Sequence, residues 1–309
     1  MKKNLVIFAR PFRLKSDIFD ELNKYFFIKM YKSKNRPDKK KILEYAKNAH
    51  AIIAGGETYN KNVLSKLTKL KIISRVGIGI DSIDLAYAKK KKIQVCNTPD
   101  APSNSAAEFS FALILMALKK INLLQHYVKN KNWQRLFHNE FSNISVGVVG
   151  YGRIGSRVAR LLHLIGIKKI YINEIDKKKI TKANKRIEFV NKKKLYNNSD
   201  IISLHVPSTK QTRNMINSKS LREFKQNSIL VNASRGDVVN ILDLEKFVRN
   251  KKISSAMLDV MPEEPYFGKL LKHKEFVITP HNASMSFDSR DKMEVGSAKN
   301  LLRWLVKNK

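Results

Sequence analysis

The sequence predicts an α/β protein with parallel sheets in two domains, one inserted into the other. Short apolar runs alternate with segments whose apolar residues recur at i, i+3 and i+4, such as 154–165 and 242–248. Near-continuous apolar strands separated by helices are typical of parallel sheets covered on both faces. The length of 309 residues suggests about two domains. With 43% hydrophobic residues, both can bury a core, which excludes a disordered chain.

The apolar runs that we predict as strands are spread over most of the chain. In order they are Leu5–Ala9, Ala51–Ala54, Lys71–Val76, Ile93–Cys96, Ser145–Gly150, Ile170–Asn173, Ile201–His205, Ser228–Asn232, Ser255–Asp259 and Phe276–Thr279. Helical patterns occupy much of the sequence between them, so consecutive strands are expected to join through helices.

Two segments are predicted to connect the domains. Residues 97–105 (NTPDAPSNS) are rich in Pro, Asn and Ser, and a long helical pattern follows them from Ala106 to about Val128. A second crossing near 282–289 precedes a closing amphipathic helix. The apolar side of that helix carries Met293, Leu301, Leu302 and Leu305. The middle of the chain is therefore predicted to be the inserted domain.

The chain is strongly basic, with 61 Lys+Arg against 26 Asp+Glu and a formal net charge of +35. Such a charge raises the hypothesis of a nucleic-acid partner. The basic residues, however, are scattered in short runs, such as 39–41, 89–92 and 177–179, in predicted turns and helix ends. This distribution favours a solvated surface over one binding face, so we do not expect a nucleic-acid partner.

Cysteine content and hydropathy predict the compartment. The single cysteine, Cys96, excludes an intrachain disulfide, and no Cys/His cluster has the spacing of zinc ligands, so no metal site is expected. The longest apolar run, near 109–118, covers half of the roughly 20 residues that a membrane span needs. We expect a cytoplasmic protein with no membrane partner.

A glycine motif predicts a dinucleotide site. Residues 145–155 read SVGVVGYGRIG, an apolar strand that runs into Gly150-x-Gly152-x-x-Gly155 at the start of a helical pattern. The first glycine makes a tight turn, the second admits a pyrophosphate, and the third lets the helix pack on the strand. The phosphates then bind at the helix N-terminus, here at Arg153 and Ile154.

An acidic residue about 20 positions further on is expected to bind the ribose hydroxyls. Residues 170–176 read IYINEID, and we choose Glu174, which lies 24 positions after Gly150. Asn173 and Asp176 remain alternatives, because sequence does not place a strand end to one residue. A carboxylate repels a 2′-phosphate, which favours NAD, although the following lysines at 177–179 leave NADP open.

Further segments repeat one layout, an apolar strand that ends in polar residues. They are 228–236 (SILVNASRG), 254–265 (SSAMLDVMPEEP) and 276–284 (FVITPHNAS). In open α/β sheets, ligands bind beyond the carboxyl ends of the strands. Arg235, Asp259, Glu264 and His281 are therefore expected to converge beside the nicotinamide.

These segments resemble those of a known enzyme family. Three other segments share this resemblance: RVGIGIDSIDL (75–85), NTPDAPSNSAAE (97–108) and LHVPSTKQTRNMIN (204–217). Together they are similar to the D-isomer-specific 2-hydroxyacid dehydrogenases, including phosphoglycerate dehydrogenase-like members. The resemblance covers nearly the whole chain and is weakest over residues 10–50.

The resemblance implies an architecture and an activity. A Rossmann-type nucleotide-binding domain (99–283) is expected to interrupt a flavodoxin-like substrate domain (1–98), to which a C-terminal helix (284–309) returns. The implied activity is NAD-dependent interconversion of a D-2-hydroxy acid and its 2-oxo acid by hydride transfer. A non-enzymatic, NADH-sensing corepressor-like protein on the same fold is the alternative.

By this resemblance, Arg235, Glu264 and His281 form the catalytic trio. An imidazole has an unperturbed pKa of about 6.5, so His281 is suited to act as general acid and base. Glu264 is expected to accept a hydrogen bond from the other ring nitrogen and so orient the imidazole. The planar guanidinium of Arg235 suits the substrate carboxylate.

The resemblance also assigns binding residues. Asp259 is expected to bind the nicotinamide amide, with a helix cap as the alternative; His205 is expected to line the nicotinamide side with Pro207, with a structural role as the alternative. The full set expected at the cofactor is Gly150, Gly152, Arg153, Ile154, Gly155, Glu174, His205, Val206, Pro207, Ala233, Ser234, Arg235, Asp259, His281 and Ala283.

Two loops are expected to meet the substrate carboxylate, at 55–58 and 76–79. The set expected there is Gly56, Val76, Gly77 and Ile78, together with Arg235. The candidate substrates are 3-phosphoglycerate, glycerate/hydroxypyruvate and glyoxylate. Phosphoglycerate-specific relatives often carry Arg-Ser where this chain has Gly56-Glu57, which argues against 3-phosphoglycerate.

The helix after the first crossing is more apolar than a solvated surface allows. Phe109, Leu113, Met116 and Leu123 lie on one side of it. Burial in the core is one explanation. The resemblance favours the other, a homodimer formed through the nucleotide-binding domains.

Overall fold

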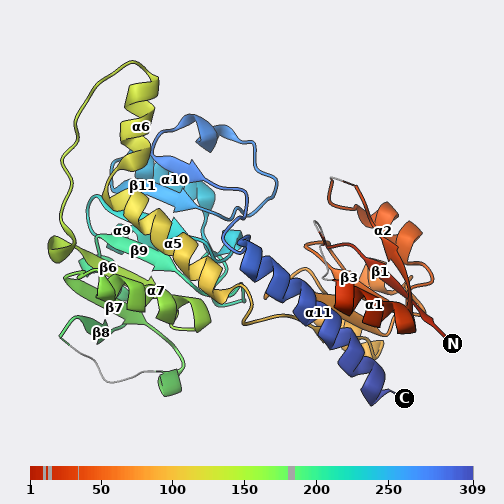
Figure 1. The fold of residues 1–309 in the computed structure, drawn as a ribbon. Helices are drawn as coiled ribbons and strands as arrows, with labels where there is room; N and C mark the ends of the chain where they lie inside the picture. Colours follow the sequence, from red (N-terminus) through yellow and green to blue (C-terminus); the bar gives the residue numbers. More distant parts are fainter. Residues whose placement is uncertain (10–11, 13–15, 34, 180–184, 309) are drawn as a thin grey trace. The chain divides into compact units, whose positions relative to one another are not determined.

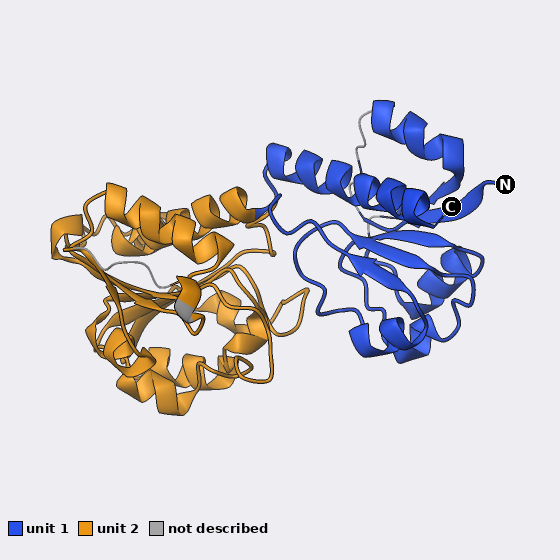
Figure 2. Cartoon of the chain, turned by 90° about the horizontal axis from the view of Figure 1, so that it is seen from below, with its two compact units in different colours: residues 1–102, 285–309 blue, residues 103–284 orange. Residues whose placement is uncertain are grey.

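The computed structural model describes residues 1–9, 12, 16–33, 35–179 and 185–308. The chain divides into two units, which Figure 2 colours separately. Unit 1 comprises residues 1–102 and 285–309, and unit 2 comprises residues 103–284. The boundaries expected from the sequence were 98/99 and 283/284.

Unit 1, in which Figure 1 labels β1 and β3, is built on a parallel sheet whose described strands follow the order β2-β1-β3-β4-β5. This 2-1-3-4-5 order is that of flavodoxin-like folds. The strands are β1 (Lys3–Ile7), β2 (Phe26–Met30), β3 (Ala51–Ala54), β4 (Ile72–Arg75) and β5 (Gln94–Cys96). The helices are α1 (Ser16–Tyr25), α2 (Lys39–Ala46), α3 (Lys61–Leu64), α4 (Leu85–Lys90) and α11 (Phe287–Lys307).

The sheet of unit 1 is buried on both faces. Neighbouring residues of β1 enter different cores, because successive strand residues point to opposite sides. Leu5 packs in a cluster with Trp304 of α11, whereas Val6 packs in a cluster with Ile42 of α2. The helix α11 therefore covers one face of this sheet.

Unit 2 is built on a second parallel sheet, whose described strands follow the order β12-β11-β10-β9-β6-β7-β8. Counted from β6, this is the Rossmann order with one added strand, which confirms the predicted fold class. The strands are β6 (Ser145–Val149), β7 (Lys169–Asn173), β8 (Ile187–Phe189), β9 (Ile201–Leu204), β10 (Ser228–Asn232), β11 (Ile253–Leu258) and β12 (Phe276–Ile278).

Helices cover both faces of this sheet. Ile201 and Val231 face the cluster that contains residues of α5 and α7, whereas Ile202 and Leu230 face α8, α9 and α10. The α-helices are α5 (Ser103–Leu118), α6 (Ile121–Lys129), α7 (Arg153–Leu164), α8 (Lys192–Asn198), α9 (Ser218–Glu223) and α10 (Ile241–Arg249). Short 3₁₀ turns are η1 (Phe141–Asn143), η2 (Lys177–Lys179), η3 (Gly236–Val238) and η4 (Lys269–Lys272).

The single helix predicted over residues 106–128 is wrong, because the structure divides it into α5 and α6. The break lies at Lys120, whose left-handed φ of 53° ends the helical path. α5 is largely core, with Leu113 and Ile114 buried against α7 and the sheet, while none of the residues of α6, all of them described, is buried. Within the described residues, no helix combines the length and the apolar character that crossing a membrane requires.

Candidate active site

The expected site residues of unit 2 follow the ends of its strands. They are Gly150 after β6, Glu174 after β7, His205 after β9, Ala233, Ser234 and Arg235 after β10, Asp259 after β11, and His281 after β12. Because these strands are parallel, their carboxyl ends meet at one edge of the sheet. The strand order reverses between β6 and β9, so the loops after these two strands flank the switch point where such folds bind ligands.

The glycine loop is packed so tightly that two of its positions exclude any side chain. Gly150 has a φ of +94°, and a Cβ built on it would lie 2.5 Å from the carbonyl oxygen of His205. A Cβ on Gly155 would lie 2.0 Å from the carbonyl oxygen of Gly150. Both glycines are therefore required by the fold of this loop.

Gly152 differs from these two glycines, because it faces open space. A Cβ built on it would meet no described atom within 4 Å, and no described side chain caps the helix that starts there. N–H groups at the start of an α-helix lack intrahelical partners and bind phosphate readily. The first residues of α7, Arg153 and Ile154, therefore fit a pyrophosphate.

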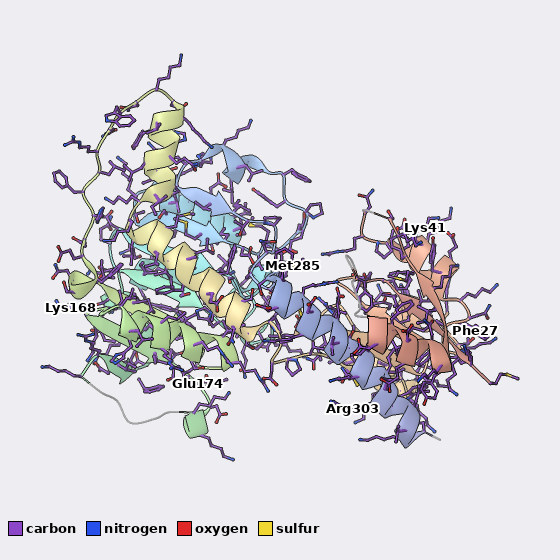
Figure 3. All side chains as sticks on the ribbon, in the orientation of Figure 1. Phe27, Lys41, Lys168, Glu174, Met285 and Arg303 are labelled. Carbon is purple, nitrogen blue, oxygen red and sulfur yellow. The ribbon has the colours of Figure 1, made fainter. Side chains whose placement is uncertain are left out.

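Glu174 is oriented toward this loop from the end of β7 (Figure 3). Its Oε2 accepts a hydrogen bond from the Tyr151 N–H at 2.7 Å, and its Oε1 accepts from the N–H groups of Ile175 and Asp176. The side chain of Asn173 instead donates to Val190, at 2.9 Å. Of the three candidates, all of them described, Glu174 is the one whose side chain contacts the glycine loop.

His205 lies directly behind the glycine loop. A Cβ on Gly155 would be 3.3 Å from the His205 Cβ, and the ring Nε2 is 2.9 Å from Ser203 Oγ. Burial lowers the pKa of His205 to about 4. The imidazole is therefore neutral at neutral pH and adds no positive charge beside the phosphates.

This burial predicts a pH dependence of folding. Unfolded His205, with a pKa of 6.5, binds a proton below pH 6.5, whereas the folded form resists protonation until about pH 4. Above pH 6.5 the ring is therefore neutral in both states, and its burial does not lower the free energy of unfolding. As the pH falls from 6.5 toward 4, the unfolded state binds a proton that the folded state does not, and the free energy of unfolding decreases. Between pH 7.5 and 5, the free energy of unfolding should fall by about 2 kcal/mol more in the wild type than in His205→Gln. Urea unfolding without cofactor measures this difference, and equal losses in the two proteins would refute it.

The turn that carries Arg235 is held by Asn232, which the sequence did not single out. The buried Asn232 Oδ1 accepts hydrogen bonds from the Ser234 N–H (3.0 Å) and Oγ (2.7 Å), and its Nδ2 donates to the Arg235 carbonyl at 2.8 Å. The Arg235 Nη1 donates to the Ser234 carbonyl at 2.7 Å. A polar residue that ends an apolar strand is the signal that could have identified Asn232.

Asp259 holds the loop that carries His281. Its fully buried carboxylate accepts from Thr279 Oγ1 (2.6 Å), the Asn282 N–H (2.7 Å) and the Ala283 N–H (2.9 Å). The His281 N–H donates to the Asp259 carbonyl at 2.9 Å. His281 adopts a φ of +55°, an uncommon value for a non-glycine residue, so this loop fixes an unusual backbone conformation at the imidazole.

His281 and Glu264 are in direct contact. The His281 Nδ1 lies 3.0 Å and 3.2 Å from the two carboxylate oxygens of Glu264, and the Met261 N–H donates to the same carboxylate at 3.3 Å. The two side chains are 46% and 26% exposed. With Nδ1 donating to the carboxylate, Nε2 is the ring nitrogen left to exchange a proton with a ligand.

Arg235 follows β10, and the neighbouring strand β11 leads to Glu264. A Cβ on Gly236 would lie 2.0 Å from the backbone carbon of Met261, so the turn after Arg235 packs against the segment that precedes Glu264. The expected trio thus comes from three neighbouring strand ends, with His281 and Glu264 in contact and Arg235 on the adjoining turn.

The expected substrate loops lie in unit 1, after β3 and β4. The Val76 N–H donates to the Ala54 carbonyl and the Gly77 N–H to Thr98 Oγ1, both at 2.9 Å. Gly77 has a φ of +134°, and Asn97 Nδ2 holds the Ile78 carbonyl at 2.8 Å. The N–H groups of Val76 and Gly77 are therefore already bonded within the protein.

Glu57 is turned inward, away from any ligand at the neighbouring Gly56. Its Oε2 accepts from the Gly55 N–H at 2.7 Å, and the side chain is buried. Burial raises the pKa of Glu57, and the nearby guanidinium groups of Arg75 and Arg36 oppose this shift. The guanidinium of Arg36 lies against Gly56, 3.1 Å from a Cβ built there.

An imidazole held by a carboxylate, at the sheet edge that also carries a dinucleotide loop, is the chemistry of a nicotinamide-dependent oxidoreductase, and the chain is an NAD(P)-dependent enzyme of that class. Residues 111–283 match the family model of the D-isomer specific 2-hydroxyacid dehydrogenase NAD binding domain. The chain belongs to the D-isomer-specific 2-hydroxyacid dehydrogenase family, as the sequence motifs predicted.

Curated relatives and solved structures agree with this assignment. A glyoxylate reductase of Korarchaeum cryptofilum is 34% identical over 291 residues, which cover 91% of this chain and 87% of the relative. A glyoxylate reductase of Thermococcus litoralis is 34% identical over 294 residues, 91% and 88% of the two chains. The structure of a D-lactate dehydrogenase from Aquifex aeolicus, complexed with NAD and lactic acid, superposes with a TM-score of 0.83 at 27% identity, covering 99% and 96%.

Proposed function

We propose that the chain reduces a small 2-oxo acid to the D-2-hydroxy acid, with His281, Glu264 and Arg235 as its catalytic residues. The contact between His281 Nδ1 and Glu264, at the sheet edge that carries the glycine loop, is the observation that carries this proposal. A histidine oriented by a carboxylate is suited to donate and accept protons at neutral pH. The same residues serve the oxidative direction, in which His281 accepts the proton.

Each residue of the trio has one task in the proposed reaction. When bound, NADH supplies the hydride that the carbonyl carbon of the 2-oxo acid receives. His281 gives the proton on Nε2 to the carbonyl oxygen, and Glu264 holds Nδ1 and stabilises the protonated ring. Arg235 binds the substrate carboxylate, for which a planar guanidinium supplies two parallel donors.

The cofactor is expected to lie over the glycine loop, with its ribose at Glu174. The open space at Gly152 and the start of α7 support a pyrophosphate there, and the bonds from Glu174 to the loop support this residue as the one that meets the ribose. A carboxylate at this position disfavours a 2′-phosphate, so we propose NAD in preference to NADP.

The loop at 76–79 of unit 1 is proposed to bind the substrate carboxylate through its later residues. The N–H groups of Val76 and Gly77 serve Ala54 and Thr98, which leaves the role to Ile78 and Gly79. Gly56 is proposed to complete the site from the other loop. The glyoxylate reductases named above support glyoxylate as the first substrate to test, with hydroxypyruvate next.

A screen of 2-oxo acids tests the proposed function. Glyoxylate, hydroxypyruvate, phosphohydroxypyruvate and pyruvate are each supplied with NADH and with NADPH, and the loss of nicotinamide absorbance is followed. We expect turnover of glyoxylate or hydroxypyruvate with NADH. An enzyme that binds NADH but reduces none of the four acids would contradict the proposal.

We propose further that the chain forms a homodimer through unit 2. α6 and the chain after it extend away from the seven-stranded sheet (Figure 1), and they expose apolar side chains. Ile121 and Val128 are about half exposed, Trp133 is 84% exposed and Phe137 98%. Apolar side chains gathered on one projecting segment are typical of a protein interface.

This proposal predicts a change of mass on substitution. Sedimentation of the wild type at micromolar concentration should show twice the monomer mass of 35.6 kDa, and the pair Trp133→Ser with Phe137→Ser should shift it to the monomer. Leu242→Ser, which alters an exposed apolar residue of α10, is the matched control and should remain dimeric. A monomeric wild type would refute the dimer.

We also propose a cytoplasmic location. The single cysteine, Cys96, is consistent with a reducing compartment, where disulfides are rare. Cell fractionation tests this proposal.

A further inference from the structure

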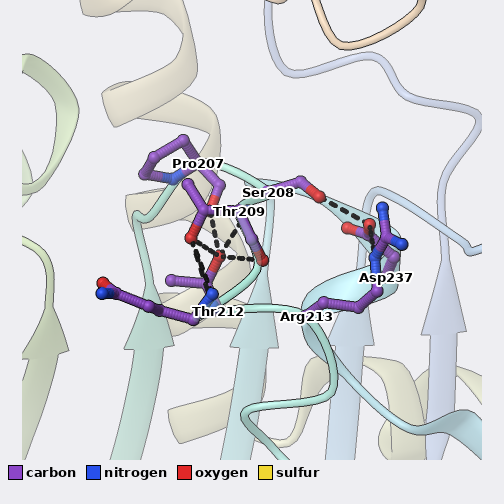
Figure 4. Close-up of polar contacts among 7 residues, drawn as sticks. Pro207, Ser208, Thr209, Thr212, Arg213 and Asp237 are labelled. Carbon is purple, nitrogen blue, oxygen red and sulfur yellow. Dashed lines mark hydrogen bonds and ion pairs between the residues drawn. The ribbon is translucent and has the colours of Figure 1, made fainter.

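The loop after β9 is closed by its own side chains (Figure 4). Thr212 Oγ1 donates to the Pro207 carbonyl at 2.6 Å and accepts from the Thr209 N–H at 2.8 Å. Thr209 Oγ1 in turn accepts from the Gln211 N–H at 3.2 Å. Residues 207–213 therefore form one small ordered loop, which begins at the switch point of the sheet.

The carboxylate of Asp237 ties this loop to η3. Its Oδ2 accepts a hydrogen bond from Ser208 Oγ at 2.5 Å and lies 3.3 Å from Arg213 Nε (Figure 4). Its backbone carbonyl accepts from the Asn214 N–H at 2.8 Å. Both ends of the loop are thus bonded to one residue of η3.

The two side-chain bonds differ in strength. Arg213 is 68% exposed, so its ion pair is screened by water and contributes little. The short bond from Ser208 to a carboxylate is charge-assisted, a class about twice as strong as neutral hydrogen bonds. The Ser208 bond therefore carries most of the connection.

Because of its position, Asp237 also joins the β9 loop to the turn that carries Arg235. It is the second residue after Arg235, and Gly236 between them is pressed against Met261 and Pro262, at 2.0 Å and 2.4 Å from a built Cβ. The turn after Arg235 is therefore confined on one side by the segment that leads to Glu264. On the other side it is held by Asp237 and the β9 loop.

We propose that Asp237 is a positioning residue that links the cofactor side of the site to the arginine that binds the substrate carboxylate. The inference rests on the proposed function, in which Arg235 holds the substrate, and on the expectation from the resemblance that Pro207 lines the nicotinamide side. Through Asp237, ordering of the β9 loop by NADH also orders the turn of Arg235. NADH and the 2-oxo acid then bind cooperatively.

The test compares two carboxylates that hold similar partners. Asp237→Ala removes both side-chain bonds and keeps the backbone bond from Asn214, whereas Asp237→Asn keeps an acceptor for Ser208 and loses the negative charge and the ion pair. The matched control is Asp200→Ala at the start of β9, where the carboxylate accepts from Lys225 Nζ (2.6 Å) and the Ser145 N–H (2.8 Å). Thermal unfolding, the Kd of NADH by nicotinamide fluorescence with and without oxalate, and the KM for glyoxylate are measured for each.

We expect Asp237→Ala to raise the Kd of NADH and the KM for glyoxylate each at least fivefold, with kcat within about threefold of wild type. Oxalate, an unreactive two-carbon acid, should tighten NADH binding in the wild type and in Asp200→Ala, but not in Asp237→Ala. Asp237→Asn should lie between the wild type and Asp237→Ala, because Ser208 keeps an acceptor but its bond is no longer charge-assisted.

Other outcomes overturn the inference. If Asp237→Ala lowers the melting temperature as Asp200→Ala does, while the Kd of NADH stays unchanged, Asp237 has only a structural role. The Kd of NADH is measured without turnover, so this result counts even if the chain reduces no 2-oxo acid. A wild type that reduces none of the acids refutes the proposed function instead.

Discussion

Replacing His281 with alanine should lower kcat for glyoxylate reduction by about 10²- to 10⁴-fold, the usual contribution of a positioned acid or base. The proton for the carbonyl oxygen would then have to come from water. The Kd of NADH should remain within about threefold, because the glycine loop and Glu174 lie after β6 and β7, away from the imidazole after β12. Steady-state kinetics and nicotinamide fluorescence measure the two quantities.

His273→Ala is the matched control for this experiment. His273 ends η4, just before β12, and its ring meets Phe276 edge-on at 6.4 Å between centroids. Its loss should leave kcat unchanged. Glu264→Gln should give an intermediate fall in kcat and an altered pH profile, because an amide does not stabilise the protonated ring. If His281→Ala retained turnover, the proton donor would have to be another group.

The sequence predicted the fold because most strands of both sheets are buried on two faces and read as unbroken apolar runs. The two strands that were missed, β2 and β8, are sheet edges. β2 follows α1 with no intervening turn, and Phe27 is exposed, so its residues merge with the helical pattern. β8 has three half-buried residues. These two edge strands lack the continuous apolar signal on which the prediction depended.

The break between α5 and α6 had no sequence signal either. Neither glycine nor proline occurs at residues 119–120, and apolar residues continue on both sides of the two lysines. A left-handed lysine is an uncommon way to end a helical path, so the periodicity predicted one helix. The broken geometry separates the buried helix α5 from the exposed α6, and this difference moved the proposed dimer contact from Leu113 to Trp133.

For the candidate site, the sequence predicted residues at strand ends but not the contacts that hold them. Strand ends and glycine spacing predicted where Gly150, Glu174 and His281 lie, since each follows directly from the end of a parallel strand. The bond between Ser208 and Asp237 joins residues 29 positions apart, and no local pattern indicates it. The supporting contacts of a site depend on which strands are neighbours, and this information exists only in the folded sheet.

Replacing Asp259 with alanine should have the second large effect, on stability and catalysis together. The change leaves Thr279 Oγ1 and the N–H groups of Asn282 and Ala283 without the fully buried carboxylate that they share as acceptor. Each buried donor without a partner costs about 1–3 kcal/mol, so the free energy of unfolding should fall by about 3 kcal/mol or more. That is a large part of the 5–15 kcal/mol typical of a folded domain.

The kcat should fall together with the free energy of unfolding, because the same loop imposes the left-handed backbone of His281. Urea unfolding and kcat are measured for Asp259→Ala and for the isosteric Asp259→Asn, whose amide keeps one acceptor oxygen but presents an N–H₂ where the second carboxylate oxygen was. We expect Asp259→Asn to be intermediate in both quantities. Asp243→Ala, which removes a carboxylate that accepts from the Ser218 N–H, is the control and should lose about 1 kcal/mol with kcat unchanged. If Asp259→Ala lost stability but kept the kcat of the wild type, the imidazole would not depend on this loop for its position.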